Sequence, residues 1–201
     1  MVAMKKETET IPAGEMKNDI QSMSLMVFRD ELTRLPNRTY FNQRLSMELE
    51  KARNVGEICS LILFELDNFR EIKDCSGNSQ GDSVLRGIAS LLGGQIQTIQ
   101  ELERKKDVYA RFGAEKFAII LPGMSLKGAY FIAQRLGKTL KNQRFPHAGK
   151  GPCNSVTASF GVVCFPAFGN TLEELLSRVE QALFLAKKNG KNRVEIYQPG
   201  Y

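Results

Sequence analysis

The sequence predicts an α+β domain in which an antiparallel-rich sheet is covered by helices. Short apolar runs typical of strands alternate with longer segments whose apolar residues recur at helical spacing. Two of the apolar runs are separated only by residues 113–116, so they are expected to form a β-hairpin. Hairpin-linked strands interspersed with helices are typical of α+β sandwiches, in which helices bury the sheet.

The first half of the domain is expected to contain two helices and a central strand. Arg38 to about Asn54 places apolar residues on one helical face, including Phe41 and Leu45. Ile58 to Leu66 is almost continuously apolar, which favours a central strand. Gly81 to about Ile99 repeats apolar residues at helical spacing and predicts a second helix.

The second half is expected to contain four strands and two helices. Ser125 is expected to be an N-cap, and Thr171 and Glu174 are expected to form a capping box that starts the last helix. Asn189-Gly190 is a typical stop for that helix. The expected elements are strands at Asp107–Phe112 and Phe117–Leu121, a helix at Ser125–Asn142, a strand at Val156–Phe165, a helix at Thr171–Lys188 and a strand at Arg193–Tyr197. The expected order of elements is therefore αβαββαβαβ.

The chain of 201 residues is long enough for one domain with its own core and a tail. Residues 1–20 are expected to be a disordered tail, residues 21–29 the end of a connecting helix, and residues 30–198 the domain. No apolar run approaches the ~20 residues that cross a bilayer, and the start lacks the apolar stretch of a signal peptide. We therefore expect a cytoplasmic protein that does not engage a membrane.

The net positive charge of the chain permits a small phosphate-bearing ligand, and solvated surface charge is the alternative interpretation. The net charge is +6, but the basic residues are scattered and do not interleave with aromatic ones. The four cysteines show no CxxC spacing, and Cys59 and Cys164 lie in apolar runs, so reduced core thiols are expected. The single histidine, His147, has no acid or cysteine nearby, and no metal site is predicted.

The most specific pattern lies between Arg104 and Phe117. It reads Arg-x-x-Asp, then five residues, then Gly-Ala-Glu-Lys-Phe. This segment resembles the product-binding and signature motifs of the diguanylate cyclase (GGDEF) family, whose signature is Gly-Gly-(Asp/Glu)-Glu-Phe. Further matches follow in the family's order, at residues 30–38, 65–82, 159–161 and 182–192. The resemblance covers residues 30 to about 197, and it implies the cyclase/polymerase-palm fold with a five-stranded sheet.

The catalytic chemistry that the resemblance implies is where this chain departs from the family. Two metal ions would be held by Glu65, where the family has Asp, by the Leu66 carbonyl and by Glu115. Lys116 replaces an acid beside those metals, and a fixed cation repels Mg²⁺. We therefore expect Lys116 to pair with Glu65 or Glu115, and we expect neither Mg²⁺ nor another cofactor.

Substrate recognition is altered as well. Lys73 replaces the guanine-reading Asn, and it has no acceptor, whereas the other guanine contact, Asp82, is kept. Ala114 adds a Cβ after Gly113, where the family's hairpin brings bare backbone to phosphate. The phosphate-binding basic residues fall on Lys187 and Lys191. Solvated lysines at a helix end are an equally good interpretation of those two residues.

The Arg-x-x-Asp pair, in contrast, is intact. By resemblance, Arg104 and Asp107 bind cyclic di-GMP, and Arg135 on the following helix supports them. Arginine suits a phosphate or the acceptor edge of guanine, and Asp accepts from guanine N–H groups. An ordinary surface ion pair is the alternative for the first two residues, and an exposed helix charge is the alternative for Arg135.

These observations together predict a catalytically inactive, degenerate member of the family that acts as a cyclic di-GMP receptor or effector. Its other partner would be a protein or a second copy of itself. Three alternatives stay open. They are a GTP-binding allosteric module that uses the old active site, a residually active cyclase, and an interaction module without a ligand.

Overall fold

The computed structural model describes residues 27–99, 107–143, 145 and 156–199. The expected tail at 1–20, most of the expected connecting helix, Arg104, His147 and Cys153 lie outside these residues. The tail and the connecting helix therefore stay predictions.

A mixed five-stranded sheet forms the centre of the molecule, in the order β2-β3-β1-β4-β5. The central strand β1 pairs antiparallel with β3 and β4, and β2 pairs antiparallel with β3. Among the described strands, only the short β5 pairs in parallel, with β4. The strands are β1 (Cys59–Leu66), β2 (Val108–Arg111), β3 (Lys116–Pro122), β4 (Ala158–Phe165) and β5 (Val194–Ile196). The sheet confirms the predicted fold class.

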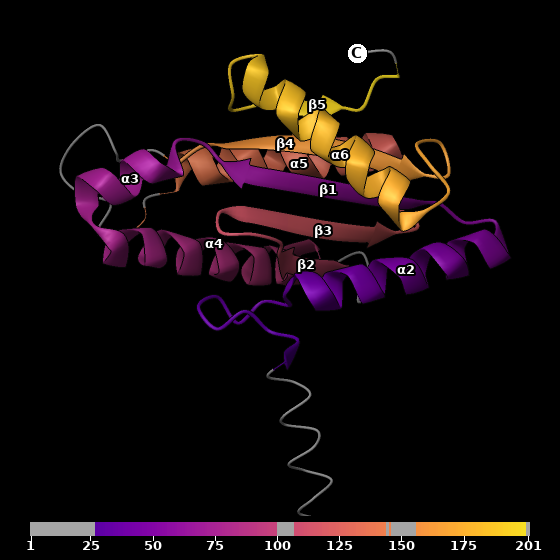
Figure 1. Cartoon of the computed structure of the whole chain (residues 1–201), viewed down its shortest axis with the longest axis horizontal. Coiled ribbons are helices and arrows are strands. Elements are labelled where there is room, and N and C mark those ends of the chain that lie inside the picture. The colour runs from indigo at the N-terminus through magenta and orange to yellow at the C-terminus, as the bar shows by residue number, and fades with distance from the viewer. Residues whose placement is uncertain (1–26, 100–106, 144, 146–155, 200–201) are drawn as a thin grey trace, which may run out of the picture.

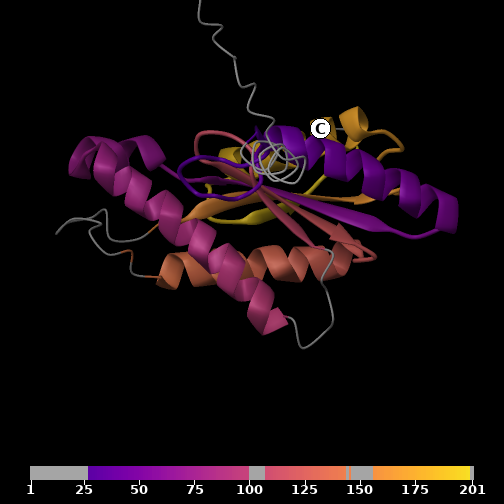
Figure 2. The same ribbon diagram turned by 90° about the horizontal axis from the view of Figure 1, so that it is seen from below.

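Helices cover both faces of this sheet, as Figures 1 and 2 show. On one face, α2 and α6 pack on the core around Phe41, Leu45 and Leu183. On the other face, α3, α4 and α5 pack on the core around Phe64, Phe117 and Phe160, whose rings stack. The helices are α2 (Arg38–Val55), α3 (Phe69–Ser76), α4 (Asn78–Ile99), α5 (Leu126–Asn142) and α6 (Leu172–Lys188).

The predicted order of elements was wrong at one point, because it lacked α3. This helix has eight residues, too few to show a helical period, and its described buried side chains are Phe69 and Ile72. Gly77 separates it from α4, which begins at Asn78 and not at Gly81. The helix matters because it follows β1 directly and carries Lys73.

The predicted helix caps are present, and one of them is modified. Ser125 accepts a hydrogen bond from the Gly128 N–H, as predicted. Thr171 accepts from the Glu174 N–H, but the Glu174 carboxylate accepts from the Asn170 N–H, one residue earlier than in a standard capping box. Both side chains therefore accept backbone N–H groups at the start of α6.

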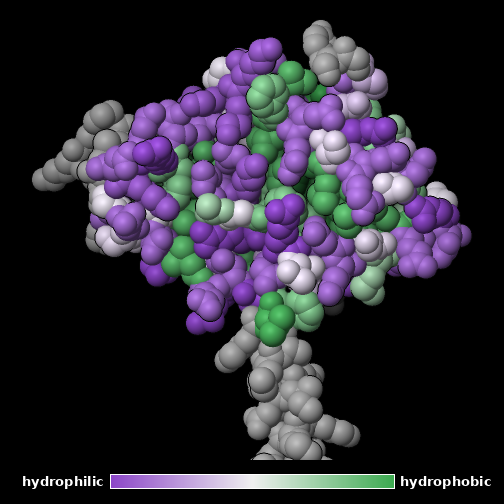
Figure 3. Space-filling view, in the orientation of Figure 1, coloured by the Kyte–Doolittle hydropathy of each residue, from purple (hydrophilic) through white to green (hydrophobic). Residues whose placement is uncertain are grey.

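Cys59 and Cys164 are buried free thiols, which confirms the prediction for these two. Burial, followed by the nearby Glu48, raises the pKa of Cys59 to about 12, so this thiol is inert at neutral pH. In the part of the chain that the structure describes, no helix is long and apolar enough to cross a membrane. The face in Figure 3 is mostly hydrophilic, with apolar residues in small patches.

Candidate functional site

The β2–β3 hairpin is held in shape by Arg111, a residue that the sequence did not single out. Its guanidinium donates to the Gly113 carbonyl at 3.2 Å and to the Ala114 carbonyl at 2.7 Å. The same group bonds the Asp30 carboxylate at 2.9 Å. Burial raises the pKa of Asp30, but hydrogen bonds from Thr33 and Arg111 outweigh it, so the pKa is lowered overall. The hairpin turn is thereby tied to the segment before α2.

The Glu65 carboxylate at the end of β1 contacts two lysines. Glu65 lies directly opposite Lys116 in the β1–β3 ladder, and the Lys116 Nζ is 3.5 Å from Oε2. Lys187, in the last turn of α6, donates to the other oxygen, Oε1. The Glu65 side chain is 12% exposed, whereas each lysine side chain is 38% exposed. The predicted Lys116 ion pair is confirmed, and the Lys187 contact adds a second cation.

The remaining residues of the expected metal site lie close to this pair. The Leu66 N–H donates to the Glu115 carbonyl at 3.2 Å, which joins the end of β1 to the hairpin. Among the described residues, no group of three or more histidines, cysteines, aspartates or glutamates could hold a metal ion.

Asp67 is a buried acid that sequence reasoning missed. It accepts from the Ser159 hydroxyl at 2.6 Å, the Thr157 hydroxyl at 2.8 Å and the Asn192 N–H at 3.0 Å. These donors come from β4, from the segment just before it, and from the turn between α6 and β5. The second Asp of the resemblance motif was the available signal. Asp67 holds this end of the sheet together.

The turn around Asp67 has an unusual backbone. Asn68, Lys191 and Asn192 all have positive φ, which non-glycine residues rarely adopt. The Lys191 ammonium donates to the Asn68 side-chain oxygen. Lys187 and Lys191 are therefore not simply solvated charges at a helix end, since Lys187 binds Glu65 in β1 and Lys191 binds Asn68, which precedes α3.

The two residues expected to read guanine lie on α3 and α4. The Lys73 ammonium lies 5.0 Å from the centroid of the Phe69 ring, so its charge is partly satisfied by a cation–π contact. Its stem packs over Gly81, where an added Cβ would meet the Lys73 Cγ at 2.8 Å. Asp82, the next residue, is partly buried in the first turns of α4.

The predicted cyclic di-GMP clamp is described only in part, because Arg104 lies outside the described residues. Asp107 is partly buried and immediately precedes β2, and Arg135 is exposed on α5. The start of β2 pairs with the end of β3, from which the chain enters α5 after three residues. Asp107 and Gly113 lie at opposite ends of β2, roughly 20 Å apart at strand spacing. Asp107, the clamp residue that the structure describes on this strand, therefore lies away from the hairpin site.

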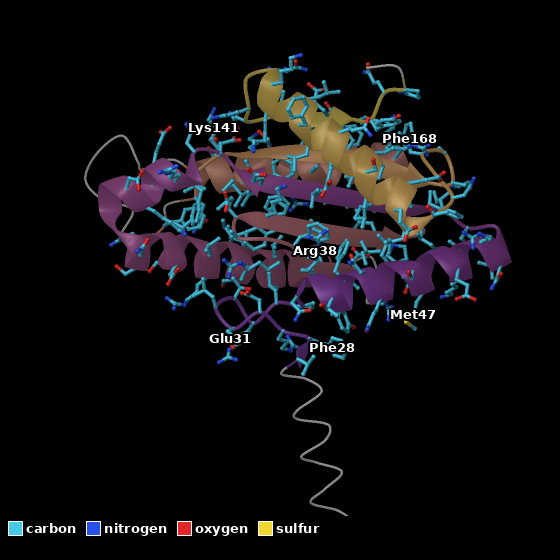
Figure 4. The ribbon with its side chains drawn as sticks, in the orientation of Figure 1. Phe28, Glu31, Arg38, Met47, Lys141 and Phe168 are labelled. Carbon is cyan, nitrogen blue, oxygen red and sulfur yellow. The ribbon has the colours of Figure 1, made fainter. Side chains whose placement is uncertain are left out.

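A cavity of about 570 Å³ opens between α5 and β5. Lys138, Lys141 (labelled in Figure 4) and Arg193 line it above an apolar floor that includes Phe160. None of the predicted site residues that the structure describes lines this cavity.

The five-stranded sheet, with an acid at the end of its central strand facing a hairpin, places this chain among the cyclase-like α+β domains. Residues 27–193 match the family described as "Diguanylate cyclase, GGDEF domain", and the chain belongs to this family.

Individual relatives agree with this assignment. The chain is 34% identical over 168 residues to diguanylate cyclase DgcP of Pseudomonas aeruginosa, covering 83% of this chain and 23% of DgcP. SiaD of the same organism, solved in complex with its activator SiaC, is 28% identical with a TM-score of 0.72, over 91% of this chain and 67% of that chain.

The coiled coil and GGDEF domain of DgcB from Caulobacter crescentus, solved with c-di-GMP, has a TM-score of 0.79 at 22% identity, over 91% and 92% of the two chains. At that identity, the likeness supports the fold. The chain spans well under half of the length of the first curated relatives that it matches.

Proposed function

We propose that this chain is a degenerate GGDEF domain that makes no cyclic di-GMP and instead binds it, acting as a receptor. Ligand would bind at Arg104 and Asp107, assisted by Arg135. The observation that carries the proposal is the charge arrangement at Glu65, where both carboxylate oxygens contact lysine ammonium groups.

The residues at the old catalytic centre do not fit a Mg²⁺ ion. Mg²⁺ needs hard oxygen ligands in near-ideal geometry at ~2.0–2.1 Å. Here Glu65 already compensates Lys116 and Lys187, and removing it from them would leave two cations facing the metal. At ~4 Å and an effective dielectric of ~20, each unit-charge contact is worth about 4 kcal/mol before solvent relaxes it. This cost supports an inactive domain that functions without Mg²⁺.

The receptor part of the proposal rests on residue types and their position. Cyclic di-GMP has two phosphates, which need cations, and guanine edges, which need an acceptor such as Asp107 beside an arginine. Asp107 immediately precedes β2 and lies away from the altered hairpin. The substitutions in the hairpin signature therefore do not alter the charged groups of Arg104 and Asp107.

Arg104→Ala should weaken cyclic di-GMP binding by roughly ten- to a hundredfold, since a charge-assisted contact is worth ~1.5–3 kcal/mol. Asp107→Ala should also lose affinity, and Lys116→Ala should change it little because Lys116 lies at the other end of the hairpin strands. Isothermal titration calorimetry measures all three variants against the unmodified chain. Absence of heat up to high micromolar ligand with the unmodified chain would refute the receptor function.

The domain should convert no GTP·Mg²⁺ to cyclic di-GMP. Lys116→Glu alone should not restore turnover, because Glu65, Lys73 and Ala114 would still differ from the family pattern. Chromatographic analysis against a reaction without protein measures the product. Product above that background would favour the residually active cyclase.

The output of such a receptor would pass through a protein partner or a second copy of the domain. SiaD, a relative solved with an activator protein, shows that a member of this fold engages a partner. The GTP-binding alternative would use Asp82, Lys187 and Lys191. If cyclic di-GMP binding survived Arg104→Ala and were lost in Asp82→Ala, the ligand would occupy the old active site.

A further inference from the structure

The cavity between α5 and β5 has no part in the proposed receptor function, whose described residues Asp107 and Arg135 do not line it. One wall of the cavity is a stripe along α5, because the lining residues of this helix recur at intervals of three and four positions or stand next to each other. These residues are Tyr130, Gln134, Gly137, Lys138 and Lys141. The apolar residues of the same helix are buried in the core, so α5 turns a second, largely polar face to the cavity.

The other wall comes from β5 and the turn before it, and the floor comes from β4. The floor is rigid, because Ala158 and Phe160 are each 1% exposed and belong to the core. Gly137 lets α5 approach that floor closely, since an added Cβ would lie 3.1 Å from the Phe160 Cε2 atom. The wall residues from the turn and β5 are Asn192, Arg193, Val194 and Glu195.

The cavity floor and the Glu65 carboxylate lie on opposite faces of the sheet. Phe160 packs in the core that α3, α4 and α5 cover, and it pairs with Phe64 in the β1–β4 ladder. Glu65 is the next residue after Phe64, and neighbouring side chains of a strand point to opposite faces. Its contact with Lys187 of α6 confirms this direction. The cavity therefore faces away from the Glu65 carboxylate.

Cations outnumber acids among the described residues that line the cavity. Lys138, Lys141 and Arg193 line it, together with one acid, Glu195. The Arg193 guanidinium lies 3.6 Å from the Glu195 carboxylate, so this acid compensates one cation. In the part of the chain that the structure describes, neither lysine has an ion pair with a carboxylate. The two ammonium groups are exposed and available to an anion.

The closest buried acid that contacts a wall residue does not reverse this balance. Asp67 accepts from the Asn192 N–H, but it is 7% exposed and does not line the cavity. Its oxygens are already taken up by the Ser159 and Thr157 hydroxyls. Counting its charge as well leaves three cations against two carboxylates, so the cavity still favours an anion.

We propose that this cavity binds a phosphate monoester that carries a planar polar ring, which is the chemistry of a nucleoside monophosphate. Lys138, Lys141 and Arg193 suit the phosphate group. Tyr130 supplies an aromatic surface for the ring, and its hydroxyl accepts from the Gln134 amide at 3.1 Å, which holds both side chains. The volume of about 570 Å³ lies within the range of ~300–1,000 Å³ that small-molecule sites occupy, and it exceeds what inorganic phosphate alone would fill.

A panel of AMP, GMP, CMP and UMP, titrated by isothermal titration calorimetry, tests the ligand class. At least one of them should bind the unmodified chain with a Kd below about 1 mM. Inorganic phosphate and the matching nucleoside should each bind roughly tenfold more weakly, because each supplies only one of the two groups that the cavity recognises. Tyr130→Ala should weaken the nucleotide and leave the binding of ribose 5-phosphate unchanged.

Charge variants of the cavity walls have effects of opposite sign. Lys138→Gln and Lys141→Gln should each lower nucleotide affinity roughly tenfold. Glu195→Gln should raise the affinity, because it removes the acid while the glutamine oxygen still accepts from the Asn189 amide. Lys127→Gln is the matched control, since this exposed lysine lies on the same helix about 16 Å from Lys138 and does not line the cavity.

Thermal unfolding checks that every variant is folded. The inference is overturned if none of the four nucleotides binds below about 1 mM, if Lys127→Gln weakens binding as much as Lys138→Gln, or if Glu195→Gln weakens it. Loss of nucleotide binding in Arg104→Ala would place the ligand at the clamp and overturn it as well. Cyclic di-GMP titrated into Lys138→Gln should bind with unchanged affinity, so this arm reports the receptor function separately from the cavity.

Discussion

Gly161→Ala should destabilise the domain by about 3 kcal/mol, because β4 and α6 lie too close at this position for any side chain. A Cβ on Gly161 would be 2.3 Å from the Val179 carbonyl oxygen and 2.6 Å from the Leu183 nitrogen. Both atoms belong to the backbone of α6, so no rotamer change can relieve the overlap. The helix itself would have to move. Urea denaturation followed by circular dichroism measures the loss.

The displacement of α6 should also affect the site. Lys187, the residue that binds Glu65, is in the last turn of that helix. Gly93→Ala is the matched control, because a Cβ there meets nothing within 4 Å and the residue lies in α4. The control should raise stability by roughly 0.5–1 kcal/mol through helix propensity. Equal stability of the two variants would show that the β4–α6 contact tolerates a methyl group.

Local patterns predicted most of the fold well. The strands that became β1, β3 and β4 are long apolar runs, and their boundaries agree to within two residues. The hairpin followed from the short spacing between two such runs. Helix α3 was missed because eight residues between a strand end and Gly77 carry too little periodic signal.

The site was predicted only where its contacts follow from strand pairing or from the motif. Lys116 and Glu65 are direct partners in the β1–β3 ladder, so a hairpin beside the central strand brings them together. The Lys187 contact joins residues 122 positions apart, across α6 and β1, and no local pattern fixes that distance. The contact between Arg111 and Asp30, which are 81 positions apart, was not predicted for the same reason.

Asp67 illustrates a further limit. It lies in an acid-containing motif whose first member carries the expected chemistry, and its own partners are 90, 92 and 125 positions away. A sequence motif does not distinguish an acid that binds substrate from an acid that holds the backbone around it. Burial and three inward donors make that distinction in the structure.

Asp67→Ala should lower the free energy of unfolding by about 3–5 kcal/mol, since it leaves three donors at a buried position without their acceptor. The loss should extend to the site, because the Asn192 N–H anchors the turn that carries Lys191.

Asp67→Asn keeps the size of the side chain, so it separates the contribution of the hydrogen bonds from the contribution of side-chain volume. An amide oxygen at the position of Oδ2 can still accept from Thr157 and from the Asn192 N–H, and the amide NH₂ at the position of Oδ1 can donate to the Ser159 oxygen. The asparagine variant should therefore lose less than about 2 kcal/mol of the free energy of unfolding.

A double variant tests whether Ser159 and Asp67 act together. In the Ser159→Ala background, Asp67→Ala should cost less stability than in the unmodified chain, because one of the three donors left without an acceptor is already absent. Chemical denaturation of the two single variants and the double variant measures this coupling. Additive losses would mean that Ser159 and Asp67 do not act together, and that Asp67 fixes the turn through Asn192 and Thr157 alone.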